Sequence, residues 1–245
     1  LLGDTFKKNG EDKNAIDTYE KFLEENPSHP QAPFVYINML EVYRKIESFE
    51  FIASKLKKYV ETFKPNSSWW IQNAKNVEVL SNVNTITESL IRTIGAEYHK
   101  KAEKTGNNNL YEISSSIYKD YLLLYPNGGQ YYDIKFFLAE IEFQLERYES
   151  AAKIYAEVAS DEKHDKFKEK SAYAIILCFK KLAYGEKGEG SLDELKKINI
   201  ETPQPIQSYE EKMLKGCENY LKITKSEEER VRVTYLAARV LFKYK

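Results

Sequence analysis

Apolar side chains recur at steps of three and four residues along most of this chain, which is the pattern of amphipathic helices. Near the start of the chain, Ala15, Tyr19 and Phe22 share one such helical face. Pro27 follows them and ends the helix, because a prolyl ring has no backbone N–H and clashes with the preceding turn. The pattern predicts a helical hairpin over residues 1–27.

Glycines support this hairpin at two places. Gly3 lies between Leu2 and Phe6 on one face of the first helix, where the missing side chain leaves room for a neighbouring helix. Gly10 lies where the turn between the helices needs a flexible backbone. A short first helix, a turn and a longer second helix are therefore expected.

The same arrangement returns 99 residues later, and part of it returns after a further 99. Tyr19 corresponds to Tyr118, and Pro27 corresponds to Pro126. The other correspondences at this interval are Phe22–Tyr121–Tyr220, Val35–Ile134–Val233, Leu40–Ala139–Ala238, Val42–Ile141–Val240 and Phe143–Phe242. An interval of 99 residues is close to three helical hairpins of ~34 residues each.

Residues 2–27 resemble the signature of tetratricopeptide repeats in the pattern Leu2-Gly3-x2-Phe6-x3-Gly10-x4-Ala15-x3-Tyr19-x2-Phe22-x4-Pro27. The resemblance implies an all-α fold, an α-solenoid of antiparallel helical hairpins with a right-handed superhelical path. We expect a single array over residues 1–245, which continues beyond both ends of the chain. Its predicted hairpins are at about 1–27, 30–65, 67–126, 130–161 and 165–224, with a partial one at 226–245.

The third and fifth of these hairpins are enlarged. Residues 67–105 contain no proline and a single glycine, so they form either one long helix or two helices, with the polar cluster 81–85 as the expected break. Glycines and prolines between 185 and 205 predict a loop with one short helix at 192–197.

Composition agrees with a helical protein that has a continuous core. The chain is 42% hydrophobic, and no apolar run approaches the ~20 residues of a membrane span. Its 37 basic and 38 acidic residues are interleaved and give a net charge of −1, which offers no general attraction to nucleic acid. Cys178 and Cys217 fall on apolar helix positions, and their spacing leaves buried thiols and a disulfide both open.

No motif for catalysis, cofactor binding or metal binding is present. The three histidines, His29, His99 and His164, are far apart and lack the paired spacing of a zinc site. The glycine segments at 128–129 and 185–190 follow no strand and precede no Gly-Lys-Ser or Gly-Lys-Thr, so they do not form a phosphate loop. We predict a chain that is not an enzyme and that carries no cofactor.

Binding to a protein or peptide partner remains as the expected role. The resemblance implies that the first helix of each hairpin lines a concave groove, at 34–45, at 133–144 and at the start of the helix after Lys166. The residues expected to face this groove are Ile37, Glu41 and Arg44 in one hairpin and Phe136, Glu140 and Phe143 in another. The alternative for the aromatic members is packing between adjacent hairpins. The Lys, Asn and Arg clamp with which related co-chaperones hold a terminal carboxylate is missing at these positions.

Trp69 and Trp70 are a further candidate contact. Adjacent helical residues point about 100° apart, so both rings cannot enter one core groove equally. Burial of both rings between successive hairpins is the favoured interpretation, and the alternative is one ring in the core with the other as a partner anchor.

The phrases at 19–27 and 118–126 resemble bacterial cell-envelope repeat proteins, the group of the outer-membrane-barrel assembly lipoprotein and the Tol-Pal coordinators. This resemblance implies a scaffold that organises a multiprotein assembly, with a periplasmic or outer-membrane-associated location and a cytoplasmic one left open. Two alternatives are the non-catalytic helical part of a larger envelope enzyme and, disfavoured by the balanced charge, an RNA-binding solenoid.

Overall fold

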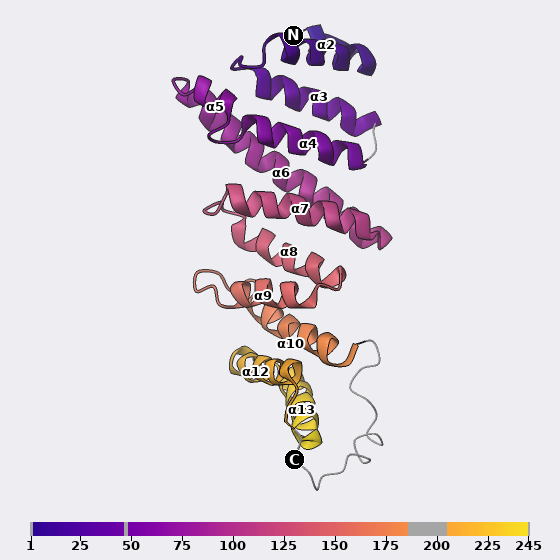
Figure 1. The fold of residues 1–245 in the computed structure, drawn as a ribbon, viewed down its shortest axis with the longest axis vertical. Helices are drawn as coiled ribbons and strands as arrows, with labels where there is room; N and C mark the ends of the chain where they lie inside the picture. Colours follow the sequence, from indigo (N-terminus) through magenta and orange to yellow (C-terminus); the bar gives the residue numbers. More distant parts are fainter. Residues whose placement is uncertain (1, 47–48, 186–204, 245) are drawn as a thin grey trace. The chain divides into compact units, whose positions relative to one another are not determined.

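The computed structural model describes residues 2–46, 49–185 and 205–244. Every regular element in these ranges is an α-helix, as the sequence predicts (Figure 1). The single array expected over residues 1–245 is divided into two compact units, Leu1–Tyr125 and Pro126–Lys245. Each unit is described by itself.

Unit 1 is a series of helices in which most pack against their neighbours in the chain, while α6 follows α5 and packs against α4 (Figure 1). Its helices are α1 (Leu2–Lys8), α2 (Asp12–Glu25), α3 (Ala32–Ile46), α4 (Phe49–Phe63), α5 (Ser68–Gln72), α6 (Val77–Thr105) and α7 (Asn108–Leu124). The longest, α6, packs along both α4 and α7. Its 29 residues give it a length of about 44 Å.

Unit 2 repeats this arrangement. Its helices are α8 (Tyr131–Gln144), α9 (Tyr148–Ala159), α10 (Lys168–Tyr184), α12 (Ser208–Ile223) and α13 (Glu227–Lys243). Helix α10 packs between α9 and α12 and contributes to two cores. The loop and short helix predicted at 192–197 lie outside the described residues.

Helix boundaries repeat at the interval found in the sequence. Helices α2, α7 and α12 end at Glu25, Leu124 and Ile223, which are successive steps of 99 residues. Helices α4 and α9 begin at Phe49 and Tyr148, again 99 residues apart. Helices α7 and α4 of unit 1 thus have equivalents in α12 and α9 of unit 2, whereas the 29-residue α6 has no helix of the same length there.

Two glycines allow the closest helix approaches in unit 1. A Cβ atom on Gly3 would lie 2.5 Å from Cε1 of Tyr19, and one on Gly95 would lie 2.8 Å from Cε1 of Tyr118. Both tyrosines are buried, and they are equivalent at the 99-residue interval. The prediction that Gly3 makes room for a neighbouring helix is confirmed.

The break in the third hairpin is not at 81–85, where the sequence predicts it. That cluster lies inside α6, and the chain breaks instead after α5. The break is set by hydrogen bonds to a segment distant in the sequence. The Trp69 indole donates to the carbonyl of His29 at 2.9 Å, and the Asn73 amide donates to the carbonyl of Ser28 at 3.0 Å. These bonds hold α5 against the turn that follows α2.

The two cysteines lie in the two cores of unit 2. Cys178 belongs to the core of α8, α9 and α10, and Cys217 belongs to the core of α10, α12 and α13. Both are buried thiols and no disulfide joins them, which settles the alternative left open by their spacing. Burial raises the pKa of the Cys178 thiol to about 12.

A buried carboxylate joins three helices of unit 2. Glu210 in α12 accepts hydrogen bonds from Tyr184 at 2.8 Å, from Lys243 at 3.0 Å and from Tyr244. Burial raises the pKa of this carboxyl, but the donors outweigh burial and leave the pKa below its ordinary value. Glu210 is therefore a charged group that the surrounding donors hold in place.

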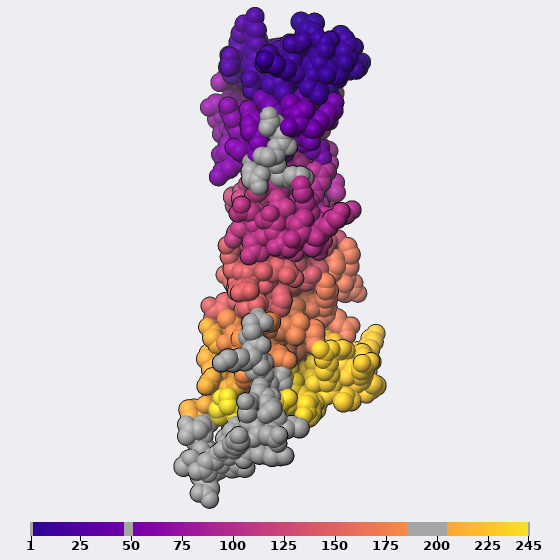
Figure 2. Space-filling model, turned by 90° about the vertical axis from the view of Figure 1, so that its right-hand side faces the viewer, coloured from indigo at the N-terminus to yellow at the C-terminus, as the bar shows by residue number. Residues whose placement is uncertain are grey.

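Side chains occupy the space that separates the ribbons of neighbouring helices within each unit (Figure 2). Many of these side chains are tyrosines, whose hydroxyl groups find partners inside the core, as with Tyr59 and Thr87 at 3.0 Å. Within the described ranges, no helix combines the length and the apolar character that crossing a lipid bilayer requires.

Candidate partner-binding groove

The predicted groove residues of α3 are engaged within unit 1. Ile37 is half-buried, Glu41 pairs with Lys7 of α1, and Arg44 pairs with Glu97 of α6. Both ion pairs join helices that are distant in sequence. Glu41 and Arg44 remain at the surface, but their charges already have partners.

Phe136 does not face a groove, and this prediction is wrong. Its side chain is 2% exposed and stacks on Phe167, with the ring centroids 4.0 Å apart and the planes 4° from parallel. The segment before α10 places Phe167 over the ring, and the Lys170 ammonium lies 4.7 Å from the Phe136 centroid. The alternative, packing between hairpins, is what the structure shows.

Glu140 and Phe143 lie near the surface of unit 2 but have partners. Glu140 accepts hydrogen bonds from the Tyr155 hydroxyl at 2.7 Å and from Lys170 at 3.0 Å. Burial and this carboxylate raise the pKa of Tyr155, so the hydroxyl stays protonated. Phe143 is half-buried, edge-on to Tyr148 at 5.2 Å.

The two tryptophans differ in burial. Trp69 is 3% exposed and packs edge-on against Phe63 at 5.4 Å, so it is a core residue and not a partner contact. Trp70 is half-buried beside it. One ring therefore lies in the core, and a partner contact at Trp70 stays a prediction.

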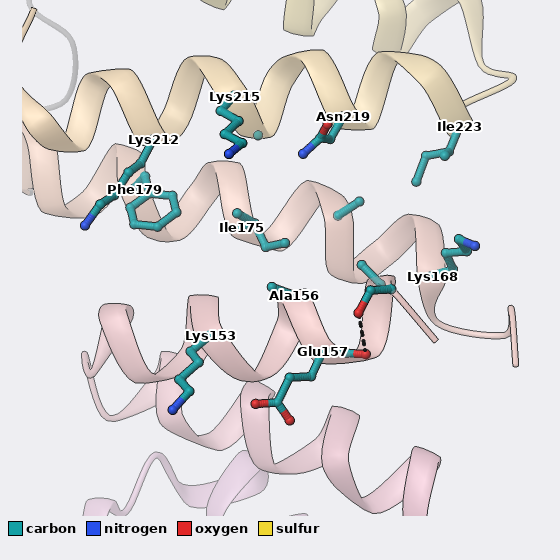
Figure 3. Close-up of a pocket in the computed structure, with 14 residues that line it drawn as sticks. Lys153, Ala156, Glu157, Lys168, Ile175, Phe179, Lys212, Lys215, Asn219 and Ile223 are labelled. Carbon is teal, nitrogen blue, oxygen red and sulfur yellow. Dashed lines mark hydrogen bonds between the residues drawn. The ribbon is translucent and has the colours of Figure 1, made fainter. Parts of the chain in front are cut away.

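A hollow lies elsewhere, between α9 and α12 in unit 2, with α10 as its floor (Figure 3). Its volume is about 700 Å³. The lining residues are Lys153, Ala156, Glu157, Ala159 and Ser160 from α9 and its end, Lys168, Ala172, Ile175 and Phe179 from α10, and Lys212, Lys215, Gly216, Asn219 and Ile223 from α12. We call this hollow the α9–α12 groove.

The α9–α12 groove has an apolar floor and a basic rim. Ile175 and Phe179 project from α10 between the two flanking helices (Figure 3). Four lysines line the groove, against one carboxylate, Glu157. Lys135 donates to Glu157 at 2.9 Å, so this negative charge is already compensated. Burial lowers the pKa of Lys135, but the bond to Glu157 outweighs burial and leaves the pKa raised.

This groove lies on a different face of α10 from the one predicted. Helices α8 and α10 begin 37 residues apart, so Tyr173, Leu177 and Lys180 correspond to the predicted residues of α8. These three line a smaller hollow of about 180 Å³ against α13. At 100° per residue, the centre of their face is about 140° around the helix from that of Ile175 and Phe179.

Unit 1 contains the equivalent of the α9–α12 groove, formed by α4, α6 and α7, with a volume of about 260 Å³. Seven lining residues on the two flanking helices correspond at the 99-residue interval, while the floor residues do not. The pairs are Ser54–Lys153, Lys57–Ala156, Val60–Ala159, Ile113–Lys212, Ser116–Lys215, Ile117–Gly216 and Asp120–Asn219. We call this smaller hollow the α4–α7 groove.

The two hollows differ in the size of their lining residues in both directions. Gly216, Ala159 and Ala156 replace the larger Ile117, Val60 and Lys57, while Lys153 and Lys215 replace the smaller Ser54 and Ser116. The floors also differ, because α10 supplies Ile175 and Phe179 in unit 2 and α6 supplies Ile91 in unit 1. The flanking helix of unit 1 also has a carboxyl group, Asp120, whose pKa burial raises, where unit 2 has an uncharged amide.

Of the groove-lining segments predicted from the sequence, the start of the helix after Lys166 contributes to the α9–α12 groove, through Lys168 and Ala172. The predicted residues of α3 and α8 do not line it. In the part of the chain that the structure describes, no group of three His, Cys, Asp or Glu residues is placed to hold a metal ion.

A scan against protein-family models finds no match, and a search of the curated proteins finds none either. Among solved structures, the chain is similar to the MamA protein, with 15% identity, a TM-score of 0.34, and coverage of 91% of this chain and 92% of that one. It is also similar to a kinesin light chain with nearly identical TPR-like repeats from Podosopora anserina, with 12% identity, a TM-score of 0.31, and coverage of 92% and 94%.

A third similar structure is a tetratricopeptide repeat protein from Parabacteroides merdae, with 10% identity, a TM-score of 0.29, and coverage of 98% and 96%. Likenesses at this level do not bear on function. The fold therefore rests on the chain's own helices, an all-α repeat whose helix boundaries recur every 99 residues.

Proposed function

We propose that this chain is a protein-interaction scaffold of the tetratricopeptide type that holds a partner polypeptide in the α9–α12 groove. The observation that carries the proposal is the contrast between two equivalent hollows. One has a volume of about 700 Å³ over an apolar floor on α10, while the other, over α6, has a volume of about 260 Å³. A hollow of the larger size with an apolar floor is typical of a ligand-binding surface.

The proposed setting is a bacterial cell envelope, where the scaffold organises a multiprotein assembly. The support for this location is the resemblance of residues 19–27 and 118–126 to envelope repeat proteins. A fusion of the full-length protein to a reporter that is active only in the periplasm tests the location separately from binding. Reporter activity confined to the cytoplasm would contradict it.

Binding in the groove is tested by photo-crosslinking in cells that express the full-length chain. A photoreactive amino acid at Asn219, an exposed lining residue, is expected to give a discrete crosslinked product. Filling the groove with Ala156→Trp should remove this product, because Ala156 is exposed and a larger side chain there occupies the hollow without disturbing the core.

The matched control is Lys57→Trp, since Lys57 is the exposed unit 1 equivalent of Ala156. This variant should leave the crosslinked product unchanged. A product that survives Ala156→Trp, or that disappears equally in Lys57→Trp, would refute binding in the α9–α12 groove. Mass spectrometry of the product identifies the partner.

A further inference from the structure

We infer that the partner segment is an acidic amphipathic helix, which lies in the α9–α12 groove with its apolar face on α10 and its carboxylates toward the lysine rim. This inference rests on the proposed function and narrows it to one class of ligand. Three properties of the lining support it: the backbone of the groove, its shape and its charge.

The backbone of the groove favours a helix over an extended peptide. All lining residues belong to α9, α10 or α12, except Ser160, which caps the end of α9. Backbone groups within helices are already hydrogen-bonded, so the groove offers no free edge to which a strand could add. A helical segment satisfies its own backbone groups and needs only side-chain contacts.

The shape of the groove matches one helix. Its lining on α12 extends from Lys212 to Ile223, which is about 16 Å at 1.5 Å per residue. A segment of roughly eleven helical residues covers this length and presents apolar side chains at steps of three and four. Ala156 and Gly216 on the flanks make the floor accessible to such side chains.

The positive charge of the groove favours a partner helix that carries carboxylate side chains. Lys153, Lys168, Lys212 and Lys215 line the groove, and the one carboxylate among the lining residues, Glu157, is bonded to Lys135. A positive rim attracts acidic side chains on both flanks of a bound helix, and it repels a basic one.

Nucleic acid is the competing polyanion, and the floor argues against it. The lining contains no arginine and a single aromatic residue, Phe179. The Lys212 ammonium lies 5.7 Å from the Phe179 ring centroid, so even this ring is in contact with a side chain. Bases bind to single-strand sites largely by stacking on aromatic rings, and the aliphatic floor provides little of that surface.

The test measures fluorescence anisotropy of labelled probes with the full-length chain. The first probe is a 15-residue peptide with Leu at positions 4, 7, 8 and 11 and Glu at its flanking positions. The second has Lys in place of each Glu, and the third has Gln in place of each Leu. A 15-nucleotide single-stranded RNA is the fourth probe. The first probe should bind most tightly, and its affinity should fall as salt is raised.

Variants locate this binding. Lys212→Glu combined with Lys215→Glu should weaken the first probe by about tenfold, because both reversed charges are exposed and partly screened. Ala156→Trp should abolish binding. Lys163→Glu removes an exposed lysine of unit 2 outside the lining, and it should change affinity less than twofold. Circular dichroism of each variant confirms that its helix content is unchanged.

The inference is overturned if the first probe does not bind, if the second or third probe binds equally well, or if RNA binds more tightly than any peptide. It is also overturned if Ala156→Trp leaves the affinity of the first probe unchanged. These failures are distinct from failure of the proposed function. A crosslink from Asn219 that is lost in Ala156→Trp, and that the first probe does not compete, would keep the scaffold and reject the acidic helix.

Discussion

Replacement of Gly95 by alanine is expected to destabilise unit 1 because the helix contact at this glycine leaves no room for a methyl group. The added Cβ would lie 2.8 Å from Cε1 of Tyr118 and 3.0 Å from Cγ2 of Ile117. The Tyr118 ring is 2% exposed and cannot swing into solvent. Overpacking of this kind costs about 1–3 kcal/mol, while the better helix propensity of alanine returns about 1 kcal/mol. The expected net loss is therefore about 1 kcal/mol of unfolding free energy.

Urea denaturation followed by tryptophan fluorescence measures this loss. Both tryptophans of the chain, Trp69 and Trp70, lie in unit 1, so their emission reports on this unit. The midpoint should fall while the dependence on urea stays constant. In a Tyr118→Leu background the same alanine should cost less, because the ring it meets is gone. A Gly95→Ala protein as stable as the wild type, or an equal cost in both backgrounds, would refute the steric reasoning.

Three further outcomes are expected. Glu210→Gln should cost about 2 kcal/mol at pH 7, since the carboxylate accepts charge-assisted bonds. Because its folded pKa is lowered, the wild type should lose this advantage as the pH falls below 4.5, and circular dichroism melts across pH 3–7 should converge. Tyr59→Phe should cost about 1 kcal/mol in urea denaturation by leaving the buried Thr87 hydroxyl without this bond. Trp69→Phe should raise amide exchange in α5, because the indole bond to His29 is lost, and unchanged exchange would contradict that role.

Local patterns predicted the helices well because the ends of helices are local events. Pro27 and Pro126 follow the ends of α2 and α7 closely, and the 99-residue interval placed their equivalents correctly. The break near Asn73 was missed because it depends on bonds to a turn some 40 residues earlier, which no local pattern contains. A polar cluster at 81–85 fits inside a helix whenever the helix has a solvent-facing side.

The candidate site was less predictable than the fold. Aromatic residues on one face of a helix give the same sequence pattern whether that face packs against a neighbouring helix or binds a partner protein. Phe136 lies in the core. The α9–α12 groove depends on how α9, α10 and α12 pack against one another. The spacing of apolar residues along a chain predicts which face of a helix is buried, but it does not predict how much space remains between the helices.

The equivalence of the two grooves also has a practical consequence for engineering. The segments 53–60 and 113–120 and their counterparts 152–159 and 212–219 occupy the same helical positions, 99 residues apart. A chimera that carries the unit 2 segments in unit 1 therefore places Ala156, Gly216 and the lysines of the flanks over the α6 residue Ile91 instead of the α10 floor. Such a protein separates the contribution of the flanking helices from that of the floor within one chain.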